Sequence, residues 1–412
     1  MKFSGSLAGC CRSCGSSDLA SVLDLGETPL ADRMPNEAQL SEPEPTFPLE
    51  VVFCRQCALV QILETVPPEV LFCDDYPYFS SYSETLLDHS RTNVEELIKK
   101  RGLNESSRVI ELASNDGYLL QYYAQQGIPV LGVDPADGPG KVAIEKGIPT
   151  EIAFFTIELA KRLAAEGKQA DVIHANNVLA HVEDTNGFVS GISELLKPDG
   201  VAVIEHPYVR DLVEQNQFDT IYHEHLCYFS VTALDALFRR HDLYLQDIRR
   251  LPIHGGSLRS YVGKVDSPSE EVVRLLKEER ELGLHTEEYY SAFSRKVRGV
   301  CDELKELLTR LKGEGASIAA YGAAAKGSTL INVVGIGREL VDFVVDRNVH
   351  KQGRHMPGQK LPILSPEELL KRMPDYTVIL PWNFADEILK QQSDYRKKGG
   401  KFIIPIPSPE VL

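Results

Sequence analysis

Residues 108–117 read RVIELASNDG, an apolar run that ends in small and acidic residues. The run predicts a buried β-strand, and Gly117 predicts a turn into a helix. A carboxylate, small residues and a glycine at that turn let a ligand approach the backbone at the carboxyl edge of a parallel sheet. The dinucleotide fingerprint GxGxxG is absent, because Ala113 and Asn115 stand where glycines are expected. The stretch therefore predicts a ligand site without a pyrophosphate cradle.

Strand and helix signals alternate on the C-terminal side of this stretch. Apolar runs rich in Val and Ile recur as RVIELA, PVLGVD, ADVIHANNVL and VAVIEHP, separated by segments of helical period. This alternation predicts a parallel sheet covered on both faces. After a helix at 231–241, two strands joined by a Gly-Gly turn, over 244–264, predict an antiparallel end to that sheet.

A second α/β unit is predicted near the end of the chain. A charged helical region at about 268–312 is expected to form two helices that break near Gly283. New strand signals then follow in SIAAY, VDFVVD, TVIL and KFII. The chain therefore combines two α/β units joined by helices.

Composition is typical of a globular protein of two or three domains, with 412 residues, 43% hydrophobic and 25% charged. The net charge of −16 argues against binding to nucleic acid or to an anionic membrane. A small anionic ligand would need a locally basic pocket. No apolar run is long enough to span a membrane, and the first residues do not have the pattern of a signal peptide. We expect a cytoplasmic protein.

Four cysteines form two C-x2-C pairs, the spacing in which two thiolates bind one tetrahedral zinc ion. Cys10 is an alternative to Cys11, but only Cys11 has the two-residue spacing to Cys14. A site closed by four cysteines has no open position for water, so the zinc would be structural. The predicted metal ligands are Cys11, Cys14, Cys54 and Cys57.

Side chains suited to a nucleoside follow the strands of the first unit. Asp134 ends the second strand, where a carboxylate can bind the two hydroxyls of a ribose. Phe154 and Phe155 follow the third strand, where an adenine can stack, and Asn176 and Asn177 end the fourth. The sequence therefore predicts one nucleoside-binding edge in this unit.

The second unit contains GAAAKGST at 322–329, which superficially resembles a P-loop. Lys326 precedes the second glycine instead of following it, so its ammonium would not reach the β- and γ-phosphates in the P-loop manner. A strand, a small-residue turn and a helix start are nevertheless present, and a helix N-terminus binds phosphate oxygens. Basic residues after the next strand favour a nucleoside diphosphate here, although they could also be solvated surface charges.

Residues 222–230, YHEHLCYFS, gather acid–base groups in nine positions. The zinc-protease motif HExxH is excluded, because His223 and His225 are two residues apart and cannot share one helical face. The segment therefore offers acid–base side chains without a metal.

Taken together, the C-x2-C pairs, ELASNDG, YHEHLCYFS, HGGSLR and YGAAAKGS resemble the three-domain nucleotide-sugar C-methyltransferases of deoxysugar and antibiotic biosynthesis. The sequence is most similar to the C-3 methyltransferases that act on a dTDP-3-amino-2,3,6-trideoxy-4-keto-hexose on the way to nitrosugars of the tetronitrose type. This resemblance implies a class I methyltransferase Rossmann-like domain at 75–265, preceded by a zinc-binding module at 1–74. A C-terminal Rossmann-like nucleotide-sugar domain with a helical linker would occupy 266–412. S-adenosylmethionine would bind the middle domain, and the dTDP-sugar would lie between the middle and C-terminal domains of a monomer or small homo-oligomer.

The resemblance also implies roles for individual residues. The expected S-adenosylmethionine contacts are Glu111, Ala113, Asn115, Asp116, Gly117, Asp134, Pro135, Phe154, Asn176 and Asn177. The expected contacts to the nucleotide sugar are Tyr321, Lys326, Asp346, Arg347, Lys351 and Asn383.

Carbon methylation needs a carbanion, and a ketone acidifies the neighbouring C–H because the negative charge can lie on oxygen. Histidine suits the base, and hydrogen-bond donors must stabilise the enolate. The family pattern implies His225 as the base, with Glu224 orienting it or binding the sugar amine. Tyr222 would donate to the enolate or act as an alternative base, and His181 could serve instead. Further expected positions are Tyr76 closing the pocket, His254 touching substrate, His223 in a structural role, and Cys227 and Tyr228 in packing.

Two other classes of function compete with this interpretation. One is a zinc-ribbon scaffold whose α/β units bind no cofactor, which the presence of Glu111, Asp134 and the YHEH cluster disfavours. The other is an NAD-dependent sugar oxidoreductase, which the absence of GxGxxG and of a suitable Tyr-x-x-x-Lys pair disfavours.

Overall fold

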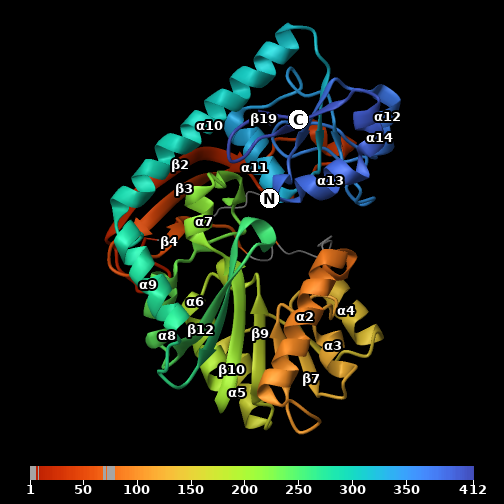
Figure 1. Cartoon of the computed structure of the whole chain (residues 1–412). Helices are drawn as coiled ribbons and strands as arrows, with labels where there is room; N and C mark the ends of the chain where they lie inside the picture. Colours follow the sequence, from red (N-terminus) through yellow and green to blue (C-terminus); the bar gives the residue numbers. More distant parts are fainter. Residues whose placement is uncertain (1–5, 8, 68–70, 72–78) are drawn as a thin grey trace.

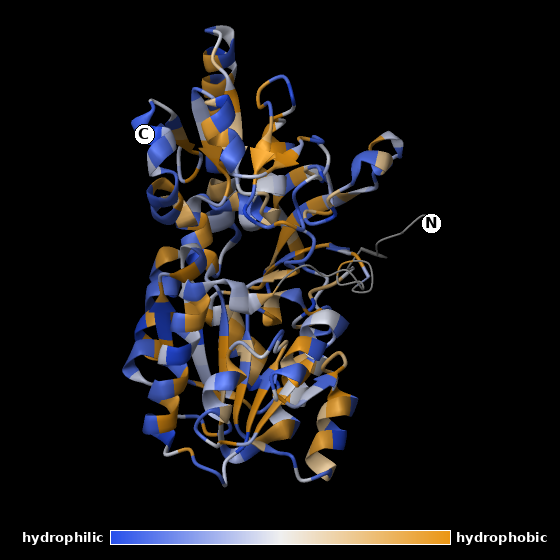
Figure 2. Ribbon diagram, turned by 90° about the vertical axis from the view of Figure 1, so that its right-hand side faces the viewer, coloured by the Kyte–Doolittle hydropathy of each residue, from blue (hydrophilic) through white to orange (hydrophobic). Residues whose placement is uncertain are grey.

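The computed structural model describes residues 6–7, 9–67, 71 and 79–412 of the chain. Three main sheets are stacked along the length of the molecule (Figure 1). The seven-stranded sheet, which is the middle one in the sequence, lies at one end of the molecule. The C-terminal sheet lies at the other end, and the N-terminal strands lie between them (Figure 1). The strands carry mostly hydrophobic residues, while hydrophobic and hydrophilic residues alternate along the helices (Figure 2).

The middle sheet has seven strands in the order β12-β13-β10-β9-β6-β7-β8. Strand β13 pairs antiparallel with β10, whereas β6, β7, β8, β9 and β10 pair in parallel. This is the class I methyltransferase arrangement, and the predicted antiparallel end over 244–264 is confirmed. The strands are β6 (Val109–Leu112), β7 (Val130–Asp134), β8 (Thr150–Ile152), β9 (Ala170–Asn176), β10 (Leu196–Pro207), β12 (Tyr244–Leu251) and β13 (Ser257–Gly263).

Helices connect these strands and cover both faces of the sheet (Figure 1). Helix α2 begins at a Ser83 cap, whose side chain accepts from the Leu86 amide, and ends at Gly102 in the left-handed region, φ 63°. The helices are α2 (Glu84–Arg101), α3 (Leu120–Ala124), α4 (Asp137–Glu145), α5 (Ile157–Ala165), α6 (Thr185–Leu195), α7 (Val209–Glu214) and α8 (Val231–Arg239).

The N-terminal module is built on an antiparallel sheet in the order β11-β4-β3-β2. Strands β2 (Leu19–Pro29), β3 (Thr46–Cys54) and β4 (Val60–Ile62) come from this module, but β11 (Cys227–Tyr228) comes from YHEHLCYFS. The acid–base segment therefore contributes one short strand to the N-terminal sheet. A short pair of strands, β1 (Ser6–Leu7) and β5 (Glu64–Thr65), and a 3-10 helix, η1 (Glu37–Ser41), complete the module.

Two helices link the middle and C-terminal units along one side of the molecule (Figure 1). Helix α9 (Glu270–Leu282) ends at Gly283, φ 83°, and α10 (Glu287–Gly313) follows, so the predicted break is confirmed. The buried side chains of α10 recur every three or four residues, and Tyr290 stacks on Phe53 of β3 with ring centroids 5.1 Å apart. Helix α10 thereby packs against the N-terminal sheet as well.

The C-terminal unit has a six-stranded sheet in the order β16-β15-β14-β17-β18-β19, parallel except for β19. Its strands are β14 (Ile318–Tyr321), β15 (Val344–Val345), β16 (Ile363–Leu364), β17 (Tyr376–Ile379), β18 (Lys401–Ile404) and β19 (Glu410–Val411). Its helices are α11 (Ala325–Val334), α12 (Glu367–Arg372), α13 (Ala385–Gln391) and α14 (Ser393–Lys397), with the 3-10 turn η6 (Trp382–Phe384).

Contacts join this unit to the N-terminal module. The Ser328 hydroxyl donates to the Ala31 carbonyl at 2.7 Å, and the His355 amide donates to the Pro35 carbonyl at 2.9 Å. No helix among the described residues has the length and apolar character needed to cross a bilayer.

Candidate active site

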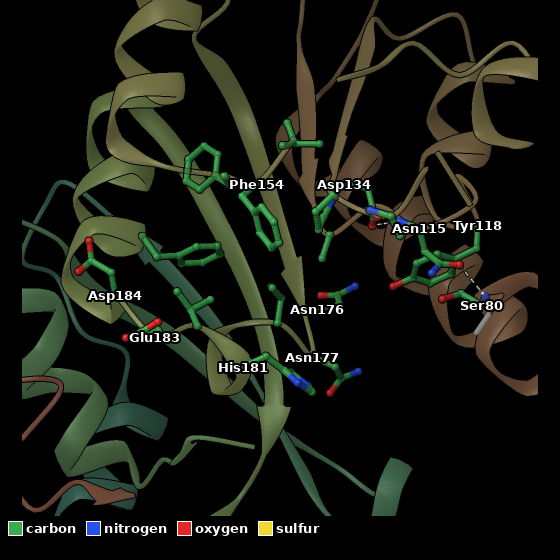
Figure 3. A pocket seen from close by; sticks show the side chains of 18 of the residues that line it. Ser80, Asn115, Tyr118, Asp134, Phe154, Asn176, Asn177, His181, Glu183 and Asp184 are labelled. Atoms are coloured by element: carbon green, nitrogen blue, oxygen red, sulfur yellow. Dashed lines mark hydrogen bonds between the residues drawn. The ribbon is translucent and has the colours of Figure 1, made fainter. Parts of the chain in front are cut away.

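A cavity of about 610 Å³ opens at the carboxyl edge of the middle sheet, where β6, β7 and β9 end. Asn115, Tyr118 and Ser80 lie on one side of it and Phe154, Glu183 and Asp184 on the other (Figure 3). Most of the predicted cofactor contacts line it, namely Ala113, Asn115, Asp134, Pro135, Phe154, Asn176 and Asn177.

Asp134 is held at the end of β7 by two backbone amides. Its Oδ2 accepts from the Asn115 amide at 2.7 Å and its Oδ1 from the Ala136 amide at 2.8 Å. Burial raises the pKa of Asp134, and the two amides act in the opposite direction. Ala113 and Asn115 adopt φ of 57° and 48°, so the loop takes the tight turn usually left to glycine. The carboxylate is thus fixed in the cavity wall with acceptor capacity remaining.

The opposite wall has features that fit an adenosine group. Phe154 is 46% exposed at the cavity, so one face of its ring is available for stacking. The Oδ1 atom of Asn176 is buried and has no hydrogen-bond partner within the part of the chain that the structure describes. A buried acceptor of this kind is satisfied by a bound donor, such as an amino group.

Three predicted cofactor residues lie behind the cavity wall instead of in it. Glu111 is fully buried, and burial raises its pKa well above the usual range, with the Tyr118 hydroxyl acting in the opposite direction. Asp116 pairs with Lys146 at 3.0 Å, and Gly117 turns at φ 76°, where a Cβ would lie 3.1 Å from Ile148 Cγ1. These residues shape the loop and do not reach the cavity.

Four polar lining residues were not expected from the sequence: Ser80, Tyr118, Glu183 and Asp184. Ser80 comes after the N-terminal module in the sequence, and its amide donates to the Asn115 side chain at 2.8 Å. Tyr118 follows SNDG directly, and the acidic pair follows NNVLAH by one residue. Their closeness to predicted positions was the signal that could have found them.

His225 is held by hydrogen bonds at both ring nitrogens. Nδ1 lies 2.7 Å from the Thr220 carbonyl, which can only accept, so Nδ1 carries the proton. Nε2 therefore has the lone pair and accepts from the Tyr222 hydroxyl at 2.9 Å. Burial, followed by the positive charge that His181 can carry, lowers the pKa of His225 well below its usual value. The ring is a neutral base at pH 7.

His181 and His254 connect this ring to the cavity. His181 packs edge-on against His225 with ring centroids 4.7 Å apart, and both His181 and His254 line the cavity. His225 and Tyr222 lie one layer farther back and do not line it. Burial lowers the pKa of His181 and of His254 to about 4. Two imidazoles that are neutral at pH 7 therefore line this end of the cavity, and the neutral ring of His225 lies behind them.

The residues next to His225 in the sequence do not take part in its hydrogen bonds. Glu224 does not orient the His225 ring, because Thr220 and Tyr222 occupy both nitrogens. Burial and the nearby Asp32 raise the pKa of Glu224 well above its usual range, and Lys351 acts in the opposite direction.

The remaining residues of the segment are structural. His223 bonds the Pro48 carbonyl at 3.1 Å in the N-terminal module, as its structural interpretation predicted. Cys227 and Tyr228 are buried in β11. Tyr76 lies outside the described residues.

The six residues predicted to contact the nucleotide sugar do not form one cluster. Two border the turn after β14, two are hydrogen-bonded to each other, one is exposed and one lies in the core. Asp346 Oδ2 accepts from the Ala323 amide at 2.6 Å, and Lys351 Nζ donates to the Ala323 carbonyl at 2.7 Å, so both border the turn after β14. Lys326 donates to Asn383 Oδ1 at 2.9 Å.

The other two predicted residues, Arg347 and Tyr321, lie away from these contacts. Arg347 is exposed and pairs with Glu387 at 3.4 Å. Tyr321 is buried in the core of the C-terminal unit.

The four predicted metal ligands meet in one cluster. The sulfur atoms of Cys11, Cys14, Cys54 and Cys57 all lie within 4.8 Å of one another. Cys11 and Cys57 are 3.5 Å apart, as are Cys14 and Cys54, close to the separation of thiolates around one tetrahedral ion. Cys10 is exposed and outside the cluster. Four sulfurs in this arrangement fit zinc and leave no position for a substrate.

Comparisons with known proteins match the three units in turn. A family model described as a methyltransferase domain matches residues 84–248, and one described as a C-methyltransferase C-terminal domain matches residues 252–407. A third, described as a candidate zinc-binding domain, matches residues 11–72.

Among curated proteins, the chain is 36% identical over 405 residues to "C-methyltransferase NovU" of Streptomyces niveus, covering 98% of this chain and 96% of NovU. A shorter match, 27% identical over 124 residues, covers 29% of this chain and 47% of a ubiquinone biosynthesis O-methyltransferase of Azorhizobium caulinodans. Among solved structures, a Burkholderia thailandensis 1,6-didemethyltoxoflavin-N1-methyltransferase matches with 18% identity and a TM-score of 0.37, over 50% of this chain and 96% of its own.

Proposed function

The chain belongs to the C-methyltransferase family, and from this premise we propose that it methylates a ring carbon next to the ketone of a nucleoside-diphosphate sugar. The specific substrate that we propose is a dTDP-3-amino-4-keto-2,3,6-trideoxy-hexose, methylated at C-3. The observation that carries the proposal is the His225–Tyr222 pair, a neutral base one imidazole away from a cavity that fits adenosine.

The proposed chemistry needs a base that is unprotonated at neutral pH and close to the methyl donor. With Nδ1 bonded to Thr220, His225 receives a proton only at Nε2, where the Tyr222 hydroxyl now donates. The pair can take the substrate proton directly at Nε2 or through the phenol oxygen. His181 is the next candidate, because it lines the cavity itself.

S-adenosylmethionine is the methyl donor that we propose for the cavity in the middle unit. When bound, it supplies an electrophilic methyl group on a sulfonium. Asp134 would bind the ribose hydroxyls, Phe154 would stack on the adenine, and the unpaired Asn176 Oδ1 would accept a hydrogen bond. We further propose zinc as a structural ion in the four-cysteine cluster, where it would stabilise the N-terminal module.

The nucleotide sugar would bind between the middle and C-terminal units, with Lys351, Asp346 and Asn383 on the C-terminal side. Glu224, which is buried where the three units meet, would bind the sugar amine.

A substrate panel tests this proposal. Purified protein is incubated with isotopically labelled S-adenosylmethionine and with dTDP- and GDP-linked keto sugars, and NMR locates the new carbon. We expect a methyl group on the carbon beside the ketone. Label on oxygen or nitrogen, or equal turnover of a sugar without the ketone, would contradict the proposal. S-adenosylhomocysteine titration serves as the binding control, and no binding at millimolar ligand would favour a scaffold role.

A further inference from the structure

Lys326 occupies an unusual environment for a lysine in an acidic protein. It lies in the first turn of α11, donates to Asn383 Oδ1 at 2.9 Å, and its Nζ lies 4.7 Å from the centroid of the Trp382 ring. The Trp382 ring therefore covers the ammonium as a cation–π partner. Lys326 was expected to contact the nucleotide sugar, and both of these partners lie in the turn η6 of its own unit.

Asp219 completes this arrangement from the middle unit. It is fully buried in the 3-10 turn η4 (Phe218–Thr220), and its Oδ2 accepts from Trp382 Nε1 at 2.7 Å. Burial raises the pKa of Asp219 to about 6, against the attraction of Lys326, so the carboxylate is still mostly charged at pH 7. Trp382 thus contacts Lys326 through its ring and Asp219 through its Nε1, and the second contact joins the two units.

The same turn positions the base. The Thr220 carbonyl accepts from His225, and the Thr329 hydroxyl of α11 donates to the Ile221 carbonyl at 3.1 Å. A Cβ at Gly255 would lie 3.1 Å from the Trp382 ring, which places Trp382 beside the residue that follows His254. Lys326 is within electrostatic range of His225 and His254, because its charge contributes to the low pKa of both rings.

We propose that the Lys326 ammonium is a catalytic group that stabilises the enolate oxygen of the substrate, with Asp219 and Trp382 as its positioning residues. The inference rests on the proposed function and names the oxyanion partner that this reaction requires. When the base removes the proton, the C–H electron pair becomes a carbon–carbon π bond and the carbonyl π pair moves onto oxygen. Lys326 then donates N–H to that oxygen. The carbonyl reforms as the carbon takes the methyl group from the sulfonium, the electron pair of the broken C–S bond stays on sulfur as a neutral thioether, and the imidazole proton passes to solvent.

An ammonium suits this task better than the surrounding groups. The three imidazoles are neutral, whereas Lys326 carries an ammonium whose pKa is lowered by burial and raised by the charge of Asp219. A donor placed in advance on a developing oxyanion commonly accounts for about 100- to 1,000-fold in rate. The competing role is a diphosphate contact, which would act on binding and leave proton removal unchanged.

Solvent-deuterium exchange into dTDP-3-amino-4-keto-2,3,6-trideoxy-hexose, without methyl donor, separates the two roles. For Lys326→Met we expect exchange to slow by about 100-fold or more while the Kd of dTDP changes less than about twofold. Lys360→Met is the matched control, because Lys360 donates to the Leu40 carbonyl at 2.7 Å away from this cluster. It should exchange at the wild-type rate.

One positioning variant and one alternative substitution of Lys326 extend the test. Asp219→Asn keeps an acceptor for Trp382 but removes the charge, so we expect slower exchange with an unchanged Kd of dTDP. If Lys326→Met does not fold by circular dichroism, Lys326→Gln replaces it.

Exchange at the wild-type rate in the Lys326 variant would overturn the inference. Weaker dTDP binding with an unchanged maximal exchange rate would overturn it as well and would assign Lys326 to the diphosphate. Failure of the proposed function is a separate result, in which the wild-type protein neither exchanges nor methylates this sugar.

Discussion

Replacing His225 by Asn tests the proposed base with little disturbance of its surroundings. An Asn amide nitrogen can take the place of Nδ1, so the bond to the Thr220 carbonyl at 2.7 Å can be kept. The Nε2 lone pair and its 2.9 Å bond from Tyr222 are lost. One lost hydrogen bond costs about 1 kcal/mol of stability, so the variant should fold. The chemistry should suffer much more than the fold.

The expected loss follows from the role of the base. Removing a general base slows proton transfer by about 100- to 10,000-fold, equivalent to about 3 to 5 kcal/mol in the barrier. The assay is solvent-deuterium exchange at the carbon beside the ketone, followed by NMR, with S-adenosylhomocysteine and dTDP affinities measured in parallel. Both affinities should stay near those of the wild type.

His223→Asn is the matched control, because it also removes a buried imidazole from the same segment. That ring bonds the Pro48 carbonyl at 3.1 Å and packs on Phe47 with centroids 5.7 Å apart, away from the cavity. We expect lower stability and a normal exchange rate in the folded fraction. Normal exchange in His225→Asn would refute the assignment and make Tyr222 or His181 the next base to test.

The pH profile of the wild-type enzyme tests the same assignment. Burial, together with the charges that His181, Lys326 and His254 can carry, lowers the pKa of His225 well below 6.5, against the Thr220 carbonyl. The base is then already neutral, and exchange should be constant between about pH 6 and about pH 8. A rate that rises around pH 6.5, the usual imidazole value, would indicate a solvated histidine as the base.

Three further predictions concern the framework around the site. Glu205→Gln should lower the free energy of unfolding by about 3 to 5 kcal/mol, because the buried Arg259, whose Nε lies 2.5 Å from Glu205, would lose its counter-charge. Urea denaturation measures this free energy, and an unchanged midpoint would contradict the prediction. Burial lowers the pKa of His206 from 6.5 to about 4, so the folded state favours the neutral ring. About 3 kcal/mol of stability that is present above pH 6.5 should therefore be lost as the pH falls toward 4. Denaturation at a series of pH values should show a shallower acid dependence for His206→Gln. Cys14→Ser should lose bound zinc and melt at a lower temperature, measured by metal analysis and thermal unfolding, whereas Cys10→Ser should match the wild type.

The sequence was most informative where function depends on local pattern. Asp134 could be placed at a sheet edge because it ends an apolar run, and parallel strands align their carboxyl ends. Gly283 could be placed between two helices because it interrupts a charged helical pattern. The C-x2-C spacing of the two cysteine pairs predicted the cluster of four sulfur atoms.

Contacts between distant segments could not be predicted in this way. Asp219 and Trp382 are far apart in sequence, and neither lies in a motif, yet they form a 2.7 Å hydrogen bond between two units. The short strand β11 has only two residues, too few to show a period of its own, so its pairing with β4 was not visible. The expectation that Glu224 orients His225 was wrong for a related reason. The main-chain carbonyl of Thr220 orients the ring, and a main-chain acceptor cannot be recognised from a sequence.

Strand β11 ties the zinc-binding fold to the reaction chemistry, since Cys227 and Tyr228 pair with β4 and the Ile62 amide donates to the Leu226 carbonyl at 3.0 Å. Excising or exchanging the first module in a chimera would remove the neighbouring backbone against which the base-bearing segment is aligned. Engineered hybrids should therefore inherit the front module and the YHEHLCYFS segment from one parent. Recombination points placed between them would separate two halves of a single sheet.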